Sequence, residues 1–157
     1  MPPRRRKRLD AAAFNLPVDD IKRGFYTDSY FVRAREILRQ DKRSPTVLMQ
    51  FSGKREGWLS GIDEAVAILK LCADDWSALT VHALYEAERF ETWDTVLTIE
   101  GAYDAFGHLE TICLGALARG TRICTNAKLL SLAQTTTNVR FGAVTAGSNF
   151  RQEMGLR

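Results

Sequence analysis

The spacing of apolar and polar residues predicts three helices along the chain. Over residues 28–40, Phe31 and Leu38 fall on one face, while Arg and Glu side chains occupy the other, as in an amphipathic helix packed against a core. The same kind of periodicity predicts a second helix at 61–72 and a long one from 108 to about 132.

Short apolar runs between these helices predict strands. They cover residues 46–51, 79–84 and 96–99, and each is bounded by polar or turn-forming residues. The expected order is helix, strand, helix, strand, strand and long helix. This order indicates an α+β fold in which helices pack on a mostly antiparallel sheet.

The long helix should be buried, because residues 112–118 leave almost no polar face. It contains Gly115 and Gly120, each of which costs a helix up to about 1 kcal/mol. The two glycines are explained if another backbone packs closely against them, or if the helix breaks near Gly120.

The expected folded domain is residues 21–129, and 157 residues suffice for one domain of ordinary size. Residues 1–20 are interpreted as a basic, disordered tail and lead-in. Residues 130–157 are predicted to be an irregular tail, because residues 134–157 are rich in Thr, Asn, Gly and Gln without a sustained period.

The net charge of +3 comes from the N-terminus. Residues 4–8 are four Arg and one Lys, so the remaining chain has 17 basic and 19 acidic residues. Five charges without interleaved aromatics give weak, salt-sensitive contact with nucleic acid at most. Nucleic acid is therefore an unlikely partner.

Neither a membrane segment nor a metal site is expected. The longest apolar run is far shorter than the roughly 20 residues of a membrane-spanning helix, and no apolar signal region follows the basic start. Cys72, Cys113 and Cys124, with His82 and His108, lack metal-ligand spacing. Buried, reduced thiols and a cytoplasmic location are expected.

The most informative stretch is the aromatic turn at residues 24–31, which leads into the first helix. Thr27 or Asp28 can cap that helix, because a short side-chain oxygen accepts from a free first-turn N–H group. Free backbone donors, a positive dipole end and flat aromatic faces together suit a planar anionic ring. The alternative is an ordinary capped helix whose aromatics belong to the core.

Three blocks of sequence resemble the N-terminal part of the nicotinate phosphoribosyltransferase family, which is related to the quinolinate phosphoribosyltransferases. The first is residues 22–31, with a Thr-Asp-x-Tyr entrance. The second is residues 96–106, with a strand, Glu-Gly and an aromatic segment. The third is residues 108–126, which resemble the closing helix of the family's N-terminal domain.

The resemblance implies transfer of a phosphoribosyl group from phosphoribosyl pyrophosphate to nicotinate. The products would be nicotinate mononucleotide and pyrophosphate, on the salvage route to NAD. Mg²⁺ and ATP are implied by the family only. A homodimer is also implied, in which this domain supplies one wall of a shared site.

The resemblance further implies substrate-binding roles for Tyr30, Asp28 and Thr27, with Tyr30 holding the pyridine ring from the neighbouring subunit; the catalytic residues stay unknown. In the quinolinate enzymes an Arg resembling position 111 meets the extra carboxylate. Here Glu110 is followed by Thr111, which favours a mono-acid such as nicotinate.

The main departure from the family is length. The C-terminal α/β barrel, with the phosphoribosyl pyrophosphate site, has no counterpart in this sequence, so a truncated or frame-shifted reading beyond about residue 129 is hypothesised. Two alternatives stay open: a non-enzymatic interaction module that keeps the fold, and a nucleic-acid binder acting through its basic tail.

Overall fold

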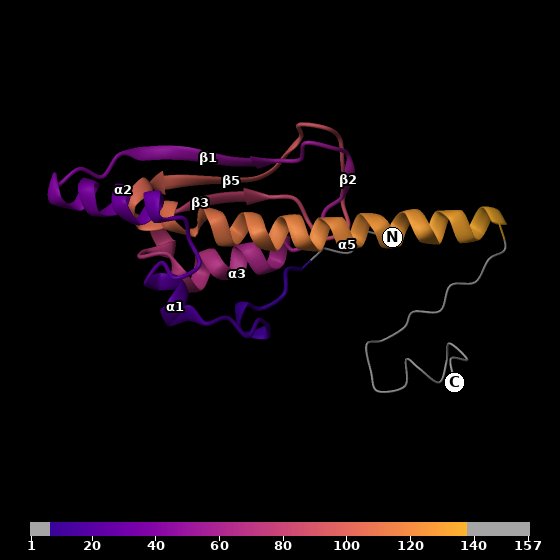
Figure 1. Cartoon of the computed structure of the whole chain (residues 1–157), viewed down its shortest axis with the longest axis horizontal. Coiled ribbons are helices and arrows are strands. Elements are labelled where there is room, and N and C mark those ends of the chain that lie inside the picture. The colour runs from indigo at the N-terminus through magenta and orange to yellow at the C-terminus, as the bar shows by residue number, and fades with distance from the viewer. Residues whose placement is uncertain (1–6, 138–157) are drawn as a thin grey trace. The chain divides into compact units, whose positions relative to one another are not determined.

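A computed structural model describes residues 7–137 and contains a three-stranded antiparallel sheet (Figure 1). The sheet order is β1 (Thr46–Ser52), β5 (Thr95–Ala102) and β3 (Thr80–Ala83). Ile99 at its centre is 1% exposed and pairs with Met49 of β1 and Val81 of β3. The predicted α+β fold with an antiparallel sheet is confirmed.

Three helices occupy the predicted positions: α2 (Ser29–Gln40), α3 (Ile62–Cys72) and α5 (Glu110–Thr137). Buried residues of α3 and α5 join those of β1 and β5 in one hydrophobic core. The remaining elements are short: η1 (Ala11–Ala13), α1 (Val18–Lys22), β2 (Gly57–Trp58), η2 (Trp76–Ala78), β4 (Arg89–Phe90), α4 (Tyr103–Phe106) and η3 (Gly107–Leu109). Strands β2 and β4 pair with each other in a separate ribbon.

The start of α3 and the middle of α5 contact each other backbone to backbone. A Cβ atom added to Gly120 would lie 2.7 Å from the Ser60 carbonyl carbon, and one added to Gly61 would lie 2.3 Å from the Ala116 oxygen. The predicted close packing is therefore confirmed at Gly120. It is wrong at Gly115, where a Cβ atom would meet nothing within 4 Å.

Helix α5 is buried on one side rather than all round. Cys113 and Leu117 face the core, but Leu114 is 48% exposed. The prediction of a fully buried segment at 112–118 was wrong because apolar composition alone does not show which side of a helix meets the core. In the described chain Leu114 lines a cavity instead.

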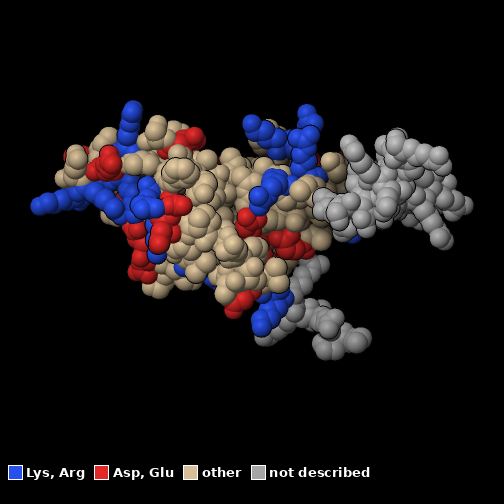
Figure 2. All heavy atoms as spheres, turned by 60° about the horizontal axis from the view of Figure 1, so that its bottom comes forward, with Lys and Arg blue, Asp and Glu red and all other residues tan. Residues whose placement is uncertain are grey.

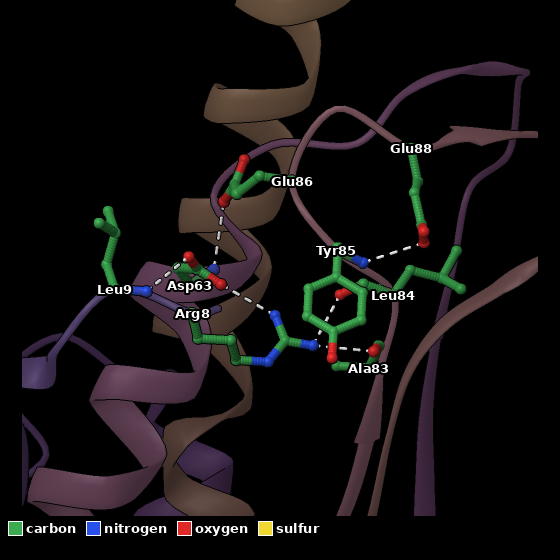
Figure 3. A network of polar contacts seen from close by, with 8 residues as sticks. All are labelled: Arg8, Leu9, Asp63, Ala83, Leu84, Tyr85, Glu86 and Glu88. Atoms are coloured by element: carbon green, nitrogen blue, oxygen red, sulfur yellow. Dashed lines mark hydrogen bonds and ion pairs between the residues drawn. The ribbon is translucent and has the colours of Figure 1, made fainter. Parts of the chain in front are cut away.

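The N-terminal segment is packed from residue 7 onward, which corrects the prediction of a disordered tail for residues 7–20. Arg8 donates to Asp63 Oδ1 at 2.8 Å and to the carbonyl oxygens of Ala83 and Leu84, each at 2.8 Å (Figure 3). Its guanidinium group also lies 4.6 Å from the centroid of the Tyr85 ring. A charge run alone does not reveal such a partner.

The network around Asp63 also anchors the start of α3. Asp63 Oδ2 accepts from the Leu9 N–H group, and Glu86 Oε1 accepts from the Asp63 N–H group (Figure 3). Gly61 precedes the helix at φ 82° and has no side chain to cap it. Glu86 therefore supplies a cap from another part of the chain.

Charged side chains of the described residues occur largely in mixed groups (Figure 2). Asp74, for example, forms ion pairs with both Arg35 and Arg39 of α2. Basic residues 4–6 lie outside the described residues. So do residues 138–157 of the predicted irregular segment, whereas residues 130–137 continue α5.

Residues 7–137 contain neither a candidate membrane-spanning helix nor a metal-type cluster. No helix there has the length and apolar character needed to cross a membrane. No three His, Cys, Asp or Glu side chains there are grouped as they would be around a metal ion. Cys72 and Cys113 are buried free thiols as predicted, while Cys124 is half-buried.

Candidate functional site

The aromatic entrance and the closing helix, far apart in sequence, meet at Thr111. The Thr111 hydroxyl lies 3.4 Å from Thr27 Oγ1, accepts from the Asp28 N–H group at 3.4 Å and lies 3.4 Å from Asp28 Oδ2. All these contacts are at the long end of hydrogen-bond geometry. The fold thus brings two predicted site residues to position 111. We call Thr27, Asp28, Tyr30, Glu110 and Thr111 the entrance site.

Asp28 occupies the N-cap position of α2 without capping it. Its backbone has the extended conformation of a cap residue, with φ −66° and ψ 139°, yet its side chain accepts no first-turn N–H group. The carboxylate instead contacts Thr111. The expected capping role is therefore wrong for the Asp28 side chain, whose carboxylate is bonded within the site rather than to the helix.

Tyr30 stands at the surface beside this contact. It is 58% exposed, whereas its neighbour Phe31 is 7% exposed and belongs to the buried residues. The two rings lie 4.1 Å apart between centroids at an angle of 35°, so Phe31 supports the Tyr30 ring from the core side. Phe25 and Tyr26 are exposed as well. The alternative of a core-facing aromatic turn is contradicted for these three aromatic residues.

The local field at the entrance site is negative. Burial raises the pKa of the Glu110 carboxyl group, and the nearby Asp28 carboxylate raises it further. A hydrogen bond from the Thr111 side chain partly offsets this rise, because it lowers the pKa of Glu110. Desolvation, followed by Glu110 and Asp28, raises the pKa of the Tyr30 phenol. These carboxylates penalise additional negative charge, most strongly a dianion.

Sequence reasoning assigned no site role to Tyr103 or His108. Tyr103 is the first residue of α4, and it contributes a small part of the upward shift in the pKa of Tyr30. The aromatic segment after Glu100-Gly101 was the sequence signal that could have singled it out. His108 is 3% exposed, and neither ring nitrogen has a hydrogen-bond partner among the described residues. Burial, reinforced by Arg35 and opposed by Asp74, lowers the pKa of His108 to about 4. His108 is therefore neutral at physiological pH.

Comparison with known proteins gives a family match over most of the folded region. The family model described as "Quinolinate phosphoribosyl transferase, N-terminal domain" matches residues 28–121. This range begins at Asp28 and includes Tyr30, Glu110 and Thr111.

The chain is also similar to solved structures. It shares 34% identity with the nicotinate-nucleotide pyrophosphorylase from Pyrococcus furiosus, at a TM-score of 0.55, over 66% of this chain and 27% of that chain. The corresponding enzyme from Francisella tularensis shows 15% identity and a TM-score of 0.44, over 66% of this chain and 36% of that chain. The chain thus matches about a quarter to a third of the length of these proteins.

Proposed function

Because the chain belongs to the family of quinolinate phosphoribosyl transferase N-terminal domains, we propose that it serves a phosphoribosyltransferase of pyridine nucleotide biosynthesis. Its part is to supply one wall of the pocket for the pyridine carboxylate. The observation that carries this proposal is the meeting of Asp28 and Thr111 beside the exposed Tyr30 ring. The name of the Pyrococcus furiosus enzyme supports the same reaction class.

In the proposed reaction, the pyridine nitrogen attacks the ribose carbon of phosphoribosyl pyrophosphate and pyrophosphate leaves. The exposed Tyr30 ring offers a flat apolar face against which the pyridine can stack. Positioning of this kind raises the rate by aligning the nitrogen with the ribose carbon. Mg²⁺ and ATP are implied by the family resemblance alone.

The electrostatics of the entrance site favour nicotinate over quinolinate as the base. Asp28 and Glu110 place negative charge beside Tyr30, and a second substrate carboxylate would increase the repulsion. Thr111 supplies a hydroxyl where an Arg would supply a positive charge. We therefore propose a mono-acid as the substrate of this enzyme.

The substitution Thr111→Arg tests this choice of base. It adds a cation next to the Asp28 carboxylate, so the ratio of the quinolinate to the nicotinate dissociation constant should fall at least fivefold. Ile123→Arg, at a 65% exposed position of α5, adds the same charge elsewhere and should leave the ratio unchanged. NMR titration of the full chain with each acid measures the ratio. An equal fall in both variants would contradict the proposed role of position 111.

We also propose that the domain acts within a homodimer, with the entrance site facing the neighbouring subunit, in the cytoplasm. The exposed aromatics Phe25, Tyr26 and Tyr30 suit such an interface, since aromatic residues are enriched at protein–protein contacts. Light scattering coupled to size-exclusion chromatography measures the oligomeric state. A strictly monomeric chain across a hundredfold range of concentration would contradict the homodimer.

A further inference from the structure

The cavity that Leu114 lines has no role in the proposed transfer reaction. It has a volume of about 390 Å³ and lies between α5 and the turn that joins β1 to β2. Its inner wall is apolar: Phe51, Leu59, Phe90 and Leu117 line it, and each is at most 5% exposed. Cavities of this size, with an apolar wall and a few polar groups, are typical of small-molecule sites.

The glycines of the turn bring the chain close to the Phe90 ring. A Cβ atom at Gly53 would lie 2.1 Å from Phe90 Cε2, and one at Gly57 would lie 3.4 Å from Phe90 Cζ. Phe90 is thereby fixed between the turn and the cavity. The wall is built from packed side chains, which gives the hollow a defined shape.

Two polar side chains on the α5 side of the cavity, Thr121 and Thr125, are already hydrogen-bonded. Thr121 Oγ1 accepts from the Ser60 N–H group at 3.2 Å, and Thr125 Oγ1 accepts from the Trp58 N–H group at 3.0 Å. Thr125 thus ties α5 to β2, and Thr121 ties it to the segment after β2. An occupant therefore meets mainly apolar surface inside the cavity.

The rim, in contrast, is positively charged. Lys54, Arg55 and Arg122 line the cavity and are exposed, and the described residues offer none of them a hydrogen-bonded or ion-paired partner. The one carboxylate at the rim, Glu56, is bound by Arg89 at 2.7 Å. Three cations thus surround an apolar interior without a matching anion in the described part of the chain.

We propose that this cavity binds a medium-chain carboxylate, with the alkyl chain against Phe90 and Leu117 and the carboxylate among Lys54, Arg55 and Arg122. The apolar wall supplies affinity that grows with chain length, about fourfold for each buried methylene group. The basic rim selects an anionic head over a neutral one. The site is separate from the entrance site, with which it shares no residue.

Isothermal titration of the full chain with octanoate, decanoate and decan-1-ol tests the proposal. Decanoate should bind with a stoichiometry of one, at least fivefold more tightly than octanoate and at least threefold more tightly than decan-1-ol. Absence of saturable decanoate binding below its micelle concentration, or binding of decan-1-ol as tight as that of decanoate, would overturn the assignment.

Variants locate the binding on the cavity. Arg122→Gln should weaken decanoate binding at least threefold, and Ala118→Trp, at an exposed lining position, should abolish it by filling the space. Arg33→Gln on α2 is the matched control for charge, and Tyr30→Ala separates this site from the entrance site; both should leave binding unchanged. Decanoate binding that survives Ala118→Trp, or weakens equally in Arg33→Gln, would contradict the proposed place.

Discussion

The Thr111 hydroxyl donates to the Asp28 carboxylate at 3.4 Å across 83 positions of sequence. The contact joins the start of α5 to the start of α2, and Tyr30 stands exposed beside it. Two segments that lie far apart in the sequence thus form one polar corner next to the exposed Tyr30 ring. The proposed function depends on this corner and on the fold that holds it.

Tyr30→Ala should remove pyridine carboxylate binding while leaving the fold intact. The side chain is 58% exposed, and substitutions at exposed positions usually change stability by no more than about 0.5 kcal/mol. Saturation-transfer NMR with nicotinate measures binding, and urea unfolding measures stability. Ile123→Ala, at another exposed position, should change neither. A loss of stability in Tyr30→Ala as large as the loss of binding would assign Tyr30 a structural role instead.

The two glycines of α5 should respond to alanine in opposite directions. Gly115→Ala meets no atom within 4 Å and should stabilise the fold by about 0.5–1 kcal/mol, because alanine favours the helix. Gly120→Ala places a Cβ atom 2.7 Å from the Ser60 carbonyl carbon and should destabilise it by about 1–3 kcal/mol through overpacking. Urea unfolding of both variants gives the comparison. Stabilisation by Gly120→Ala would show that α5 does not approach Ser60 so closely.

Arg8→Ala should destabilise the fold by about 2–4 kcal/mol. The Asp63 carboxylate, whose side chain is 7% exposed, would lose its cationic partner, and two carbonyl oxygens would lose their donor. Arg23→Ala removes an exposed ion pair with Asp20 and should cost less than about 1 kcal/mol. Equal unfolding midpoints for the two variants would mean that the N-terminal segment does not hold α3.

Stability should fall in acid because of His108. Its pKa in the folded chain is about 4, below the roughly 6.5 of an unfolded chain, so the unfolded state takes up the proton first. Neutral His108 makes its full contribution to the free energy of unfolding above about pH 6.5. About 2 kcal/mol of this free energy should be lost between pH 7 and pH 4.5. His108→Leu removes this loss and leaves the titration of the carboxyl groups common to both proteins. If the unfolding free energies of the unsubstituted chain and of His108→Leu changed in parallel with pH, a buried, neutral His108 would be contradicted.

The helices and central strands were predictable because their signals are local. The 3.6-residue period placed α2, α3 and α5, and apolar runs placed β1, β3 and β5. Strands β2 and β4 have two residues each, too few for a period to show. The ordered N-terminal segment was missed because Arg8 finds Asp63 only after the chain has folded.

The sequence predicted most of the residues of the entrance site, but not the contacts between them. Family resemblance singled out Tyr30, Asp28 and Thr27, and position 111 by its departure from Arg. The contact between Asp28 and Thr111 requires the packing of α2 against η3 and α4, which no local pattern contains. The basic cavity rim was likewise hidden, because Lys54 and Arg122 converge only through the approach of α5 to the β1–β2 turn.

The most direct test of the proposed function is the titration of the ¹⁵N-labelled full chain with nicotinate, followed by amide chemical shifts. The account predicts saturable shifts that are centred on Thr27, Asp28, Tyr30 and Thr111 and are lost in Tyr30→Ala. Absence of saturable shifts at these amides, or identical shifts in the Tyr30→Ala variant, would contradict it.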